Sequence, residues 1–162
     1  MSETPSDTTA ALPMIERRRI EAAILGHVYE TLKAAHGETA ARATIAESVR
    51  RSSIEQGRQM AAEVGGQTSL QSFAAIMPRW SKDDAITMDI KESSETRLSF
   101  DVTRCRYAEM YKQMGLGDIG DLLSCQRDGT FCEGYDSKLK LARTQTIMQG
   151  ASHCDFKYSY EK

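Results

Sequence analysis

The chain has 162 residues, of which 40% are hydrophobic and 27% charged, and its formal net charge at pH 7 is −2. This is the length and composition of one globular domain. The near-neutral charge argues against a nucleic-acid-binding protein, which needs a basic surface. No apolar run approaches the roughly 18 residues of a transmembrane helix. We therefore expect neither a nucleic-acid partner nor a membrane.

Residues 1–12 are polar and contain almost no large apolar side chains, so we expect a disordered tail. The segment has neither the basic start nor the apolar stretch of a secretory signal. This indicates a cytoplasmic location, in which thiols stay reduced. Residues 13–162 are predicted to form a single domain, with a helical part at 13–80 and a part at 85–160 that holds the sheet and the motifs.

The first predicted helix begins at Pro13 and ends before Gly37. Its apolar residues recur at every fourth position and predict its buried face: Ile20, Ile24, Val28 and Leu32. The charged run at residues 16–23 is interpreted as a solvated face of the same helix.

Two further helices are predicted before the sheet. One spans residues 38–64, and its apolar stripe is narrow enough that a partner helix, and hence a homo-oligomer, is an open alternative. The next spans residues 69–77 and is ended by Pro78. The aromatic residues Phe73 and Trp80 are interpreted as packing between helix and sheet.

The hydrophobic period then changes from helical to alternating. Two alternating runs predict an antiparallel hairpin with one buried face: Ile86, Met88, Ile90, then Leu98, Phe100, Val102. Short helices are predicted at 107–114 and 118–124, followed by a second strand pair at 138–147 and 154–160. The fold class is therefore α+β: N-terminal helices packed on a small antiparallel sheet, with two short helices inserted between the hairpins.

All four cysteines lie in the last third of the chain, at 105, 125, 132 and 154. They form no CxxC pair, which argues against a structural zinc site. A single cysteine is more often a buried core residue than a nucleophile. However, Cys105 ends a predicted strand, Cys154 begins one, and Cys125 lies three residues before Asp128. Strand ends and loops are where sites are usually built.

Two charged or titratable side chains near these cysteines are further candidates. His153 precedes Cys154, but neighbouring residues of a strand point to opposite faces, so it serves Cys154 only if the strand begins after it. Arg143 shares a predicted strand face with apolar residues, where an unpaired guanidinium is costly. It is either paired with a carboxylate or directed into a cavity to hold an anionic ligand.

Several motifs of this region occur in an order that resembles the L-2-amino-thiazoline-4-carboxylic acid hydrolase family. They are CRYAEMY from Cys105, CQRD from Cys125, RTQT from Arg143, Gly150, and CDFKY from Cys154. The resemblance covers roughly residues 85–160. It implies that residues 13–162 are a hydrolase-like domain that cleaves a carbon–nitrogen bond of a small non-aromatic heterocycle, such as a cyclic amide, an amidine or a thiazoline carboxylate.

On this resemblance we assign hypothetical roles. The catalytic candidates, as a cysteine nucleophile or as acid and base around an activated water, are Cys154, Cys125, Asp128, Glu109 and His153. The candidates for binding a carboxylate-bearing substrate are Arg143, Cys105, Thr146 and Tyr107. No cofactor and no metal ligand is assigned, although a catalytic divalent metal stays an alternative. The competing interpretation is a small-molecule-binding or sensor module on the same scaffold, without turnover.

Overall fold

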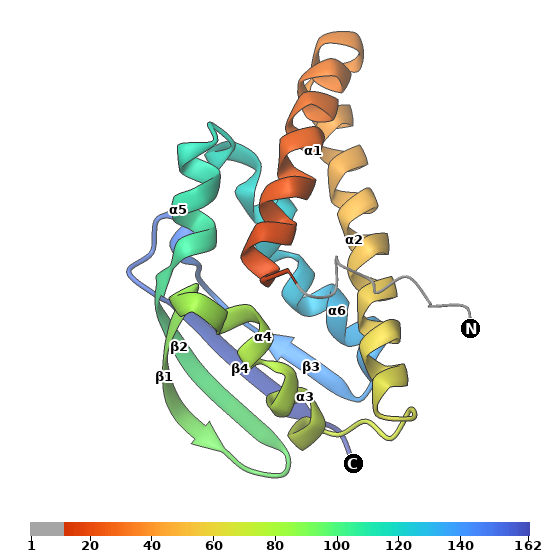
Figure 1. The fold of residues 1–162 in the computed structure, drawn as a ribbon, viewed down its shortest axis with the longest axis vertical. Coiled ribbons are helices and arrows are strands. Elements are labelled where there is room, and N and C mark those ends of the chain that lie inside the picture. The colour runs from red at the N-terminus through yellow and green to blue at the C-terminus, as the bar shows by residue number, and fades with distance from the viewer. Residues whose placement is uncertain (1–11) are drawn as a thin grey trace, which may run out of the picture.

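The computed structural model describes residues 12–162, so most of the predicted tail at 1–12 lies outside the described residues. Two long helices, α1 (Met14–His36) and α2 (Glu38–Glu63), form an antiparallel pair whose tip projects beyond the rest of the molecule (Figure 1). Gly37 joins them with φ +86°, a conformation that side chains with a Cβ rarely adopt. Both helices confirm the predicted segments. None of the helices within 12–162 combines the length and hydropathy needed to cross a membrane.

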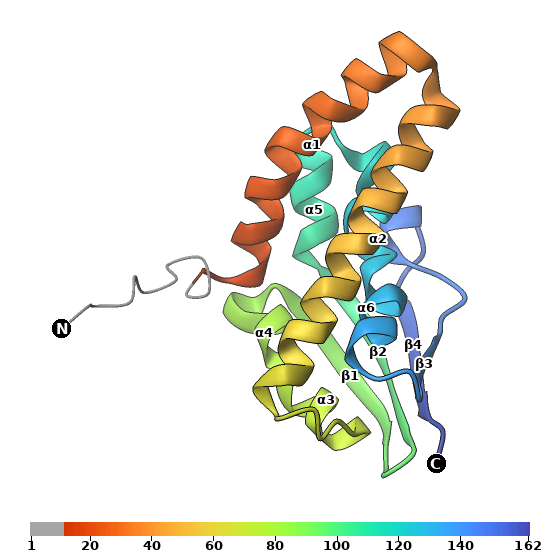
Figure 2. The same cartoon turned by 90° about the vertical axis from the view of Figure 1, so that its right-hand side faces the viewer.

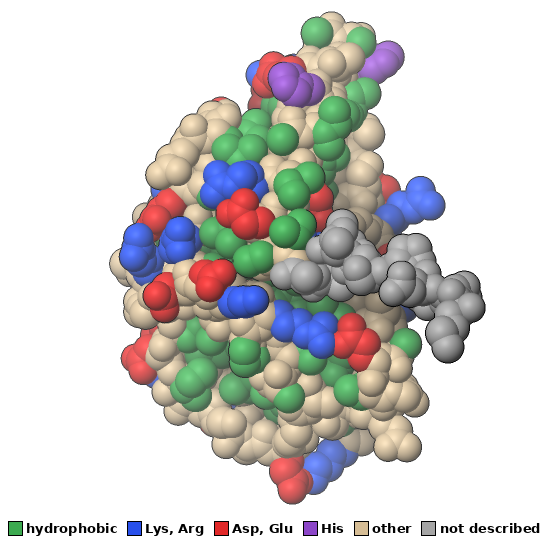
Figure 3. All heavy atoms as spheres, in the orientation of Figure 1, with side chains coloured by type: hydrophobic (Ala, Val, Ile, Leu, Met, Phe, Trp, Pro, Cys, Tyr) green, Lys and Arg blue, Asp and Glu red, His purple; other side chains and the backbone are tan. Residues whose placement is uncertain are grey.

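The predicted buried face of α1 is wrong for Ile20, Ile24 and Val28, whereas Leu32 packs partly buried against the core. Ile20 and Ile24 are 60% and 62% exposed, and the space-filling view shows hydrophobic side chains along α1 (Figure 3). The buried face is the opposite one and includes Arg18, Ala22 and Gly26. Small residues let neighbouring segments approach closely, because a Cβ on Gly26 would lie 2.9 Å from the Leu116 side chain. Close packing at Gly26 therefore determines how α1 is oriented, and its most apolar stripe is left exposed.

The third predicted helix is confirmed as α3 (Leu70–Ile76), and a capping box between Ser69 and Ser72 fixes its start. Pro78 does not end the helical region. It occupies the first turn of a further short helix, α4 (Pro78–Ser81), where the missing N–H of proline costs nothing. A 3-10 turn, η1 (Lys82–Asp84), leads into the sheet.

The sheet has four antiparallel strands in the order β1-β2-β4-β3. Their bounds are β1 (Ile86–Ser93), β2 (Arg97–Cys105), β3 (Leu139–Ala142) and β4 (Cys154–Tyr160). The helices cover one side of the sheet (Figure 2). This confirms the α+β class and the predicted hairpin, although Ile90 is 52% exposed because β1 is an irregular edge strand.

The chain between β2 and β4 is more helical than predicted. Helix α5 (Arg106–Gln113) and the turns η2 (Gly117–Ile119) and η3 (Asp121–Cys125, π-helical) match the two predicted helices, but α6 (Arg127–Tyr135) was not predicted. The sequence of α6 does not indicate a helix, because it contains two glycines and glycine disfavours helix formation. Gly134 is nevertheless required, because a Cβ there would overlap the backbone carbonyl of Ile54 on α2.

The predicted strand at 138–147 is too long. After β3 the chain turns, and a 3-10 turn, η4 (Ile147–Gln149), precedes β4. The carboxylate of Asp155 accepts hydrogen bonds from the backbone N–H groups of Thr144 (2.9 Å) and Gln145 (3.0 Å). These bonds replace strand pairing, so Arg143 leaves the sheet instead of continuing it.

Candidate functional site

Two adjoining cavities of about 70 and 60 Å³ lie between the sheet and the helices. The larger, which we call the aromatic cavity, is lined mainly by apolar side chains of α3, α6, the sheet and the junction between α3 and α4: Phe73, Met77, Phe100, Phe131 and Tyr158. The smaller, the thiol cavity, is lined by Cys105, Tyr107, Cys125, Arg143 and Cys154. Both are lined by a common set that includes Arg18, Trp80, Val102, Arg127, Asp128 and Phe156.

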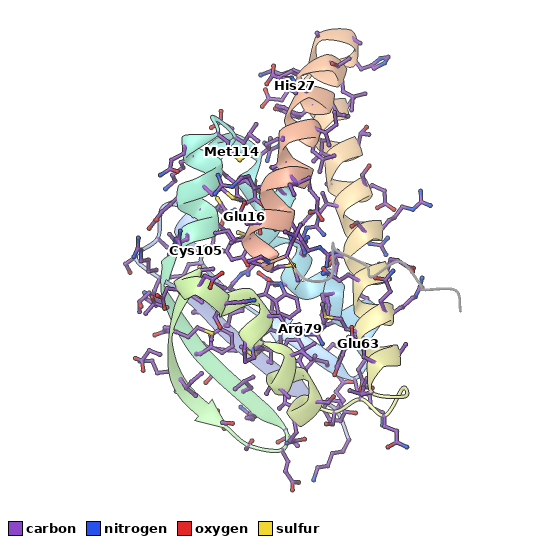
Figure 4. The ribbon with its side chains drawn as sticks, viewed as in Figure 1. Glu16, His27, Glu63, Arg79, Cys105 and Met114 are labelled. Atoms are coloured by element: carbon purple, nitrogen blue, oxygen red, sulfur yellow. The ribbon has the colours of Figure 1, made fainter. Side chains whose placement is uncertain are left out.

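Three of the four cysteines meet in the thiol cavity although they come from different elements. Cys105 lies where β2 meets α5 (Figure 4), Cys125 ends η3, and Cys154 begins β4. Burial raises the pKa of Cys105 to about 11 and raises those of Cys125 and Cys154 as well. The Cys154 sulfur also accepts a hydrogen bond from the backbone N–H of Ile147 at 3.2 Å. At neutral pH these groups are therefore thiols and not thiolates.

Cys132 lines neither cavity. Its thiol donates to the backbone carbonyl of Asp128 at 3.4 Å, and burial raises its pKa to about 12. All four cysteines are free. Within residues 12–162, no group of three or more His, Cys, Asp and Glu side chains is arranged to hold a metal ion.

Asp128 and Arg143 form an ion pair in the wall of the thiol cavity. The Nη1 of Arg143 donates to Oδ2 of Asp128 at 2.6 Å, and its Nη2 donates to the carbonyl of Cys125 at 2.9 Å. The guanidinium also lies 4.9 Å from the centre of the Phe156 ring. Burial raises the pKa of Asp128, and the charge of Arg143 opposes that rise. The first of the two alternatives for Arg143, pairing with a carboxylate, is confirmed, and the side chain also lines a cavity.

A second charged cluster, which sequence analysis missed, lies behind this pair. Arg18 and Arg127 are only 3% and 7% exposed, and both bond to Glu21. Arg18 also donates to Oε1 of Gln56 at 2.8 Å. The interpretation of 16–23 as a solvated face is wrong for Arg18. The sequence signal was its four-residue spacing from the apolar residues Met14 and Ala22, and the structure buries all three.

Six of the nine predicted site residues line the thiol cavity: Cys105, Tyr107, Cys125, Asp128, Arg143 and Cys154. The hydroxyl of Tyr107 donates to the carbonyl of Trp80 at 3.0 Å, and burial raises the pKa of Tyr107. This hydrogen bond links Tyr107, in the wall of the thiol cavity, to α4, whose Trp80 side chain lines both cavities.

The other three predicted site residues line neither cavity. Glu109 is exposed and bonds to Arg104 at 2.9 Å. His153 lies in the turn before β4, where its ring contacts Ser152 and Gln145. Thr146 is buried and caps η4 by accepting a hydrogen bond from the N–H of Gln149. These positions argue for structural contacts and leave the three functional assignments as predictions.

Comparison with known proteins identifies the fold and the family. The phenol-responsive sensory domain of the transcription activator PoxR, in complex with phenol, shares 14% identity and a TM-score of 0.51 over 86% of this chain and 74% of that one. Subunit 3 of the trafficking protein particle complex from Naegleria fowleri, covalently bound to palmitic acid, shares 11% identity and a TM-score of 0.52 over 90% and 96%. At such identities the likeness concerns the fold alone. No curated protein matches the chain. The family model of L-2-amino-thiazoline-4-carboxylic acid hydrolase matches residues 17–158, so the chain belongs to this family.

Proposed function

We propose that the protein hydrolyses a carbon–nitrogen bond of a small non-aromatic heterocycle bound across the two cavities. The observation that carries the proposal is the Asp128–Arg143 ion pair, which faces three thiols in a half-enclosed space. Membership of a hydrolase family supports it. A carboxylate, a guanidinium and three thiols in one cavity wall support the proposal, because such clusters are the usual setting of perturbed pKa values.

The size of the cavities supports a small substrate. Each is well below the roughly 150 Å³ of an engineered protein cavity that holds benzene, and the two adjoin. A five-membered ring spanning both cavities is compatible with this space, whereas a long acyl chain requires the helices to move apart. The flat rings of Trp80 and Phe156, which line both cavities, suit a planar or nearly planar heterocycle.

In the proposed reaction, a water molecule is the nucleophile. Asp128 takes a proton from the water while the water oxygen adds to the electrophilic ring carbon. The ring carbon–nitrogen bond then breaks, and the proton passes from Asp128 to the departing nitrogen. One water is consumed and the carboxylate returns to its starting state. Because a protonated Asp128 cannot accept a proton, the rate falls toward acid pH, and the raised pKa moves this fall to a higher pH than an ordinary aspartate gives.

A cysteine nucleophile is the alternative route within this proposal. Cys154, Cys125 and Cys105 all line the thiol cavity, but each must lose a proton before it attacks, and burial raises the pKa of each. A second function, binding or sensing of a small molecule without turnover, is favoured by the apolar lining of the aromatic cavity and by these neutral thiols. The phenol complex of the PoxR sensory domain provides a precedent on a similar fold.

The deciding experiment is mass-spectrometric detection of product from L-2-amino-thiazoline-4-carboxylate and a panel of cyclic amides, imides and amidines, with and without divalent metal. Asp128→Asn should abolish turnover. Cys154→Ser tests the thiol route, and Cys132→Ser is the matched control because Cys132 lines neither cavity. No product from any substrate, combined with measurable binding of one of them, would favour the binding module over the hydrolase.

A further inference from the structure

The charged side chains that line the two cavities are unbalanced. Among the described residues they comprise three guanidiniums, of Arg18, Arg127 and Arg143, and one carboxylate, of Asp128. The thiols and tyrosines that share the walls are neutral at pH 7, because burial raises their pKa values. The cavity wall therefore presents a surplus of positive charge to whatever it encloses.

Arg143 does not account for this surplus, because the carboxylate of Asp128 neutralises its charge. The remaining hydrogen bonds of the other two guanidiniums go to uncharged groups, from Arg18 to Gln56 and from Arg127 to the carbonyl of Leu123 and the hydroxyl of Ser52. Arg18 and Arg127 share a single carboxylate, that of Glu21, at 2.9 and 3.1 Å. The Glu21 side chain is itself 32% exposed and lies outside both cavities. Asp128 also attracts both guanidiniums, but it is already bound to Arg143. Two guanidiniums buried to more than nine-tenths thus have only one partly solvated carboxylate as their direct partner, an arrangement that costs free energy unless another anion approaches.

The pKa of Arg127 reflects the same imbalance. Burial and the like charge of Arg18 lower the pKa of Arg127 to about 10, although Glu21 opposes that change. An anion bound beside the two guanidiniums would relieve the repulsion between them. Arginine forks are well matched to carboxylates, with which they form paired hydrogen bonds.

We propose that Arg18 and Arg127 form a carboxylate-binding subsite, which orients a small cyclic carboxylate so that its ring lies between Trp80 and Phe156 and reaches Asp128 and the thiols. This replaces Arg143 as the substrate clamp and assigns Arg143 to positioning Asp128. The subsite adds a carboxylate-binding group to the proposed function. It rests on that function only in naming the ring carbon that would react. Carboxylate binding itself does not require turnover.

The test compares two ligands that differ only in charge. L-thiazolidine-4-carboxylate and its 4-carboxamide have a saturated ring without an amidine carbon, so neither offers the bond that the proposed reaction cleaves. Isothermal titration with the full chain should show the carboxylate binding at least about tenfold more tightly than the carboxamide. Arg18→Met and Arg127→Met should each remove most of that preference. Arg104→Met is the matched control, because Arg104 is exposed and pairs with Glu109 outside both cavities.

A variant with the opposite expected sign guards against simple misfolding. Glu21→Gln removes the anion that competes for both arginines but keeps the shape of a partly exposed side chain, and thermal unfolding of the variant establishes that it is folded before binding is compared. It should tighten carboxylate binding several-fold and leave carboxamide binding unchanged, whereas a purely structural cluster would predict weaker binding of both ligands. Equal affinity of the wild type for the two ligands, no binding of either, or weaker carboxylate binding in Glu21→Gln would overturn the subsite.

The two proposals fail in distinguishable ways. Carboxylate-selective binding without product from any heterocycle keeps the subsite and overturns the hydrolase. Product formation that is insensitive to Arg18→Met and Arg127→Met keeps the hydrolase and overturns the subsite.

Discussion

Replacement of Asp128 by Asn removes one charge and keeps the shape of the side chain. In the wild type, Oδ2 accepts a 2.6 Å hydrogen bond from Arg143, and the two side chains are 29% and 15% exposed. Removing one partner of a buried ion pair costs roughly 3–5 kcal/mol, and a hydrogen bond to a charged group contributes about 1.5–3 kcal/mol. Because the Asp128 side chain is partly exposed and burial, which raises its pKa, disfavours its charged form, we expect a loss below the buried-pair range, about 2–3 kcal/mol.

Urea denaturation and thermal unfolding measure this loss. In a chain of this length, 1 kcal/mol corresponds to roughly 2–4 °C, so the melting temperature of Asp128→Asn should fall by about 4–12 °C. Glu109→Gln breaks the exposed pair with Arg104 and serves as the control, with an expected loss below about 1 kcal/mol.

The double variant Asp128→Asn/Arg143→Met should recover part of the loss, because it also removes the guanidinium that the single variant leaves unpaired. Equal losses in Asp128→Asn and Glu109→Gln would refute the claim that the cavity wall depends on this ion pair. A double variant that is less stable than Asp128→Asn by the full cost of Arg143→Met alone would show that the two side chains are not coupled.

Three further predictions concern other parts of the site and its support. Hydrogen bonds from Thr144 and Gln145 outweigh burial and hold the pKa of Asp155 at about 2, below the roughly 3.9 of an unfolded chain. Its contribution to stability is therefore present above about pH 4 and lost as the pH falls toward 2, so the stability gap between wild type and Asp155→Asn in urea should narrow over that range; a constant gap would contradict this. Gly134→Ala should destabilise by roughly 1–3 kcal/mol because of overlap with α2, whereas Gly129→Ala in the same helix meets no atom within 4 Å and should be neutral or stabilising by up to about 1 kcal/mol. Iodoacetamide should label all four cysteines slowly below pH 8, and fast labelling of one of them would restore the thiolate nucleophile.

Local patterns predicted the elements whose neighbours lie nearby in the sequence. The alternation Leu98, Phe100, Val102 was sufficient for β2, because all three residues face one buried side of the sheet. The end of α1 was predicted from Gly37, since its positive φ is a local property of the backbone. Side-chain periodicity and turn residues report such features directly.

Features decided by distant contacts were not predictable in the same way. Ile20 and Ile24 are exposed because α1 buries the face that carries Ala22 and Gly26, and Gly26 allows close approach to Leu116. The packing of α6 against α2 requires Gly134, because any Cβ there would overlap the carbonyl of Ile54, some eighty residues earlier in the chain. Arg18 joined the site for the same reason, since its partner Gln56 and the thiol cavity belong to other elements.

Burial has opposite consequences for the two kinds of candidate catalytic group. It raises the pKa of each cavity thiol further above neutral pH, which reduces the fraction of reactive thiolate. It also raises the pKa of Asp128, but a carboxylate starts from an acidic value and therefore moves toward the pH at which a general base is most effective. The same desolvated wall that weakens the cysteines as nucleophiles thus strengthens Asp128 as a base. For this reason we expect the pH dependence of turnover to follow the aspartate and not a thiol.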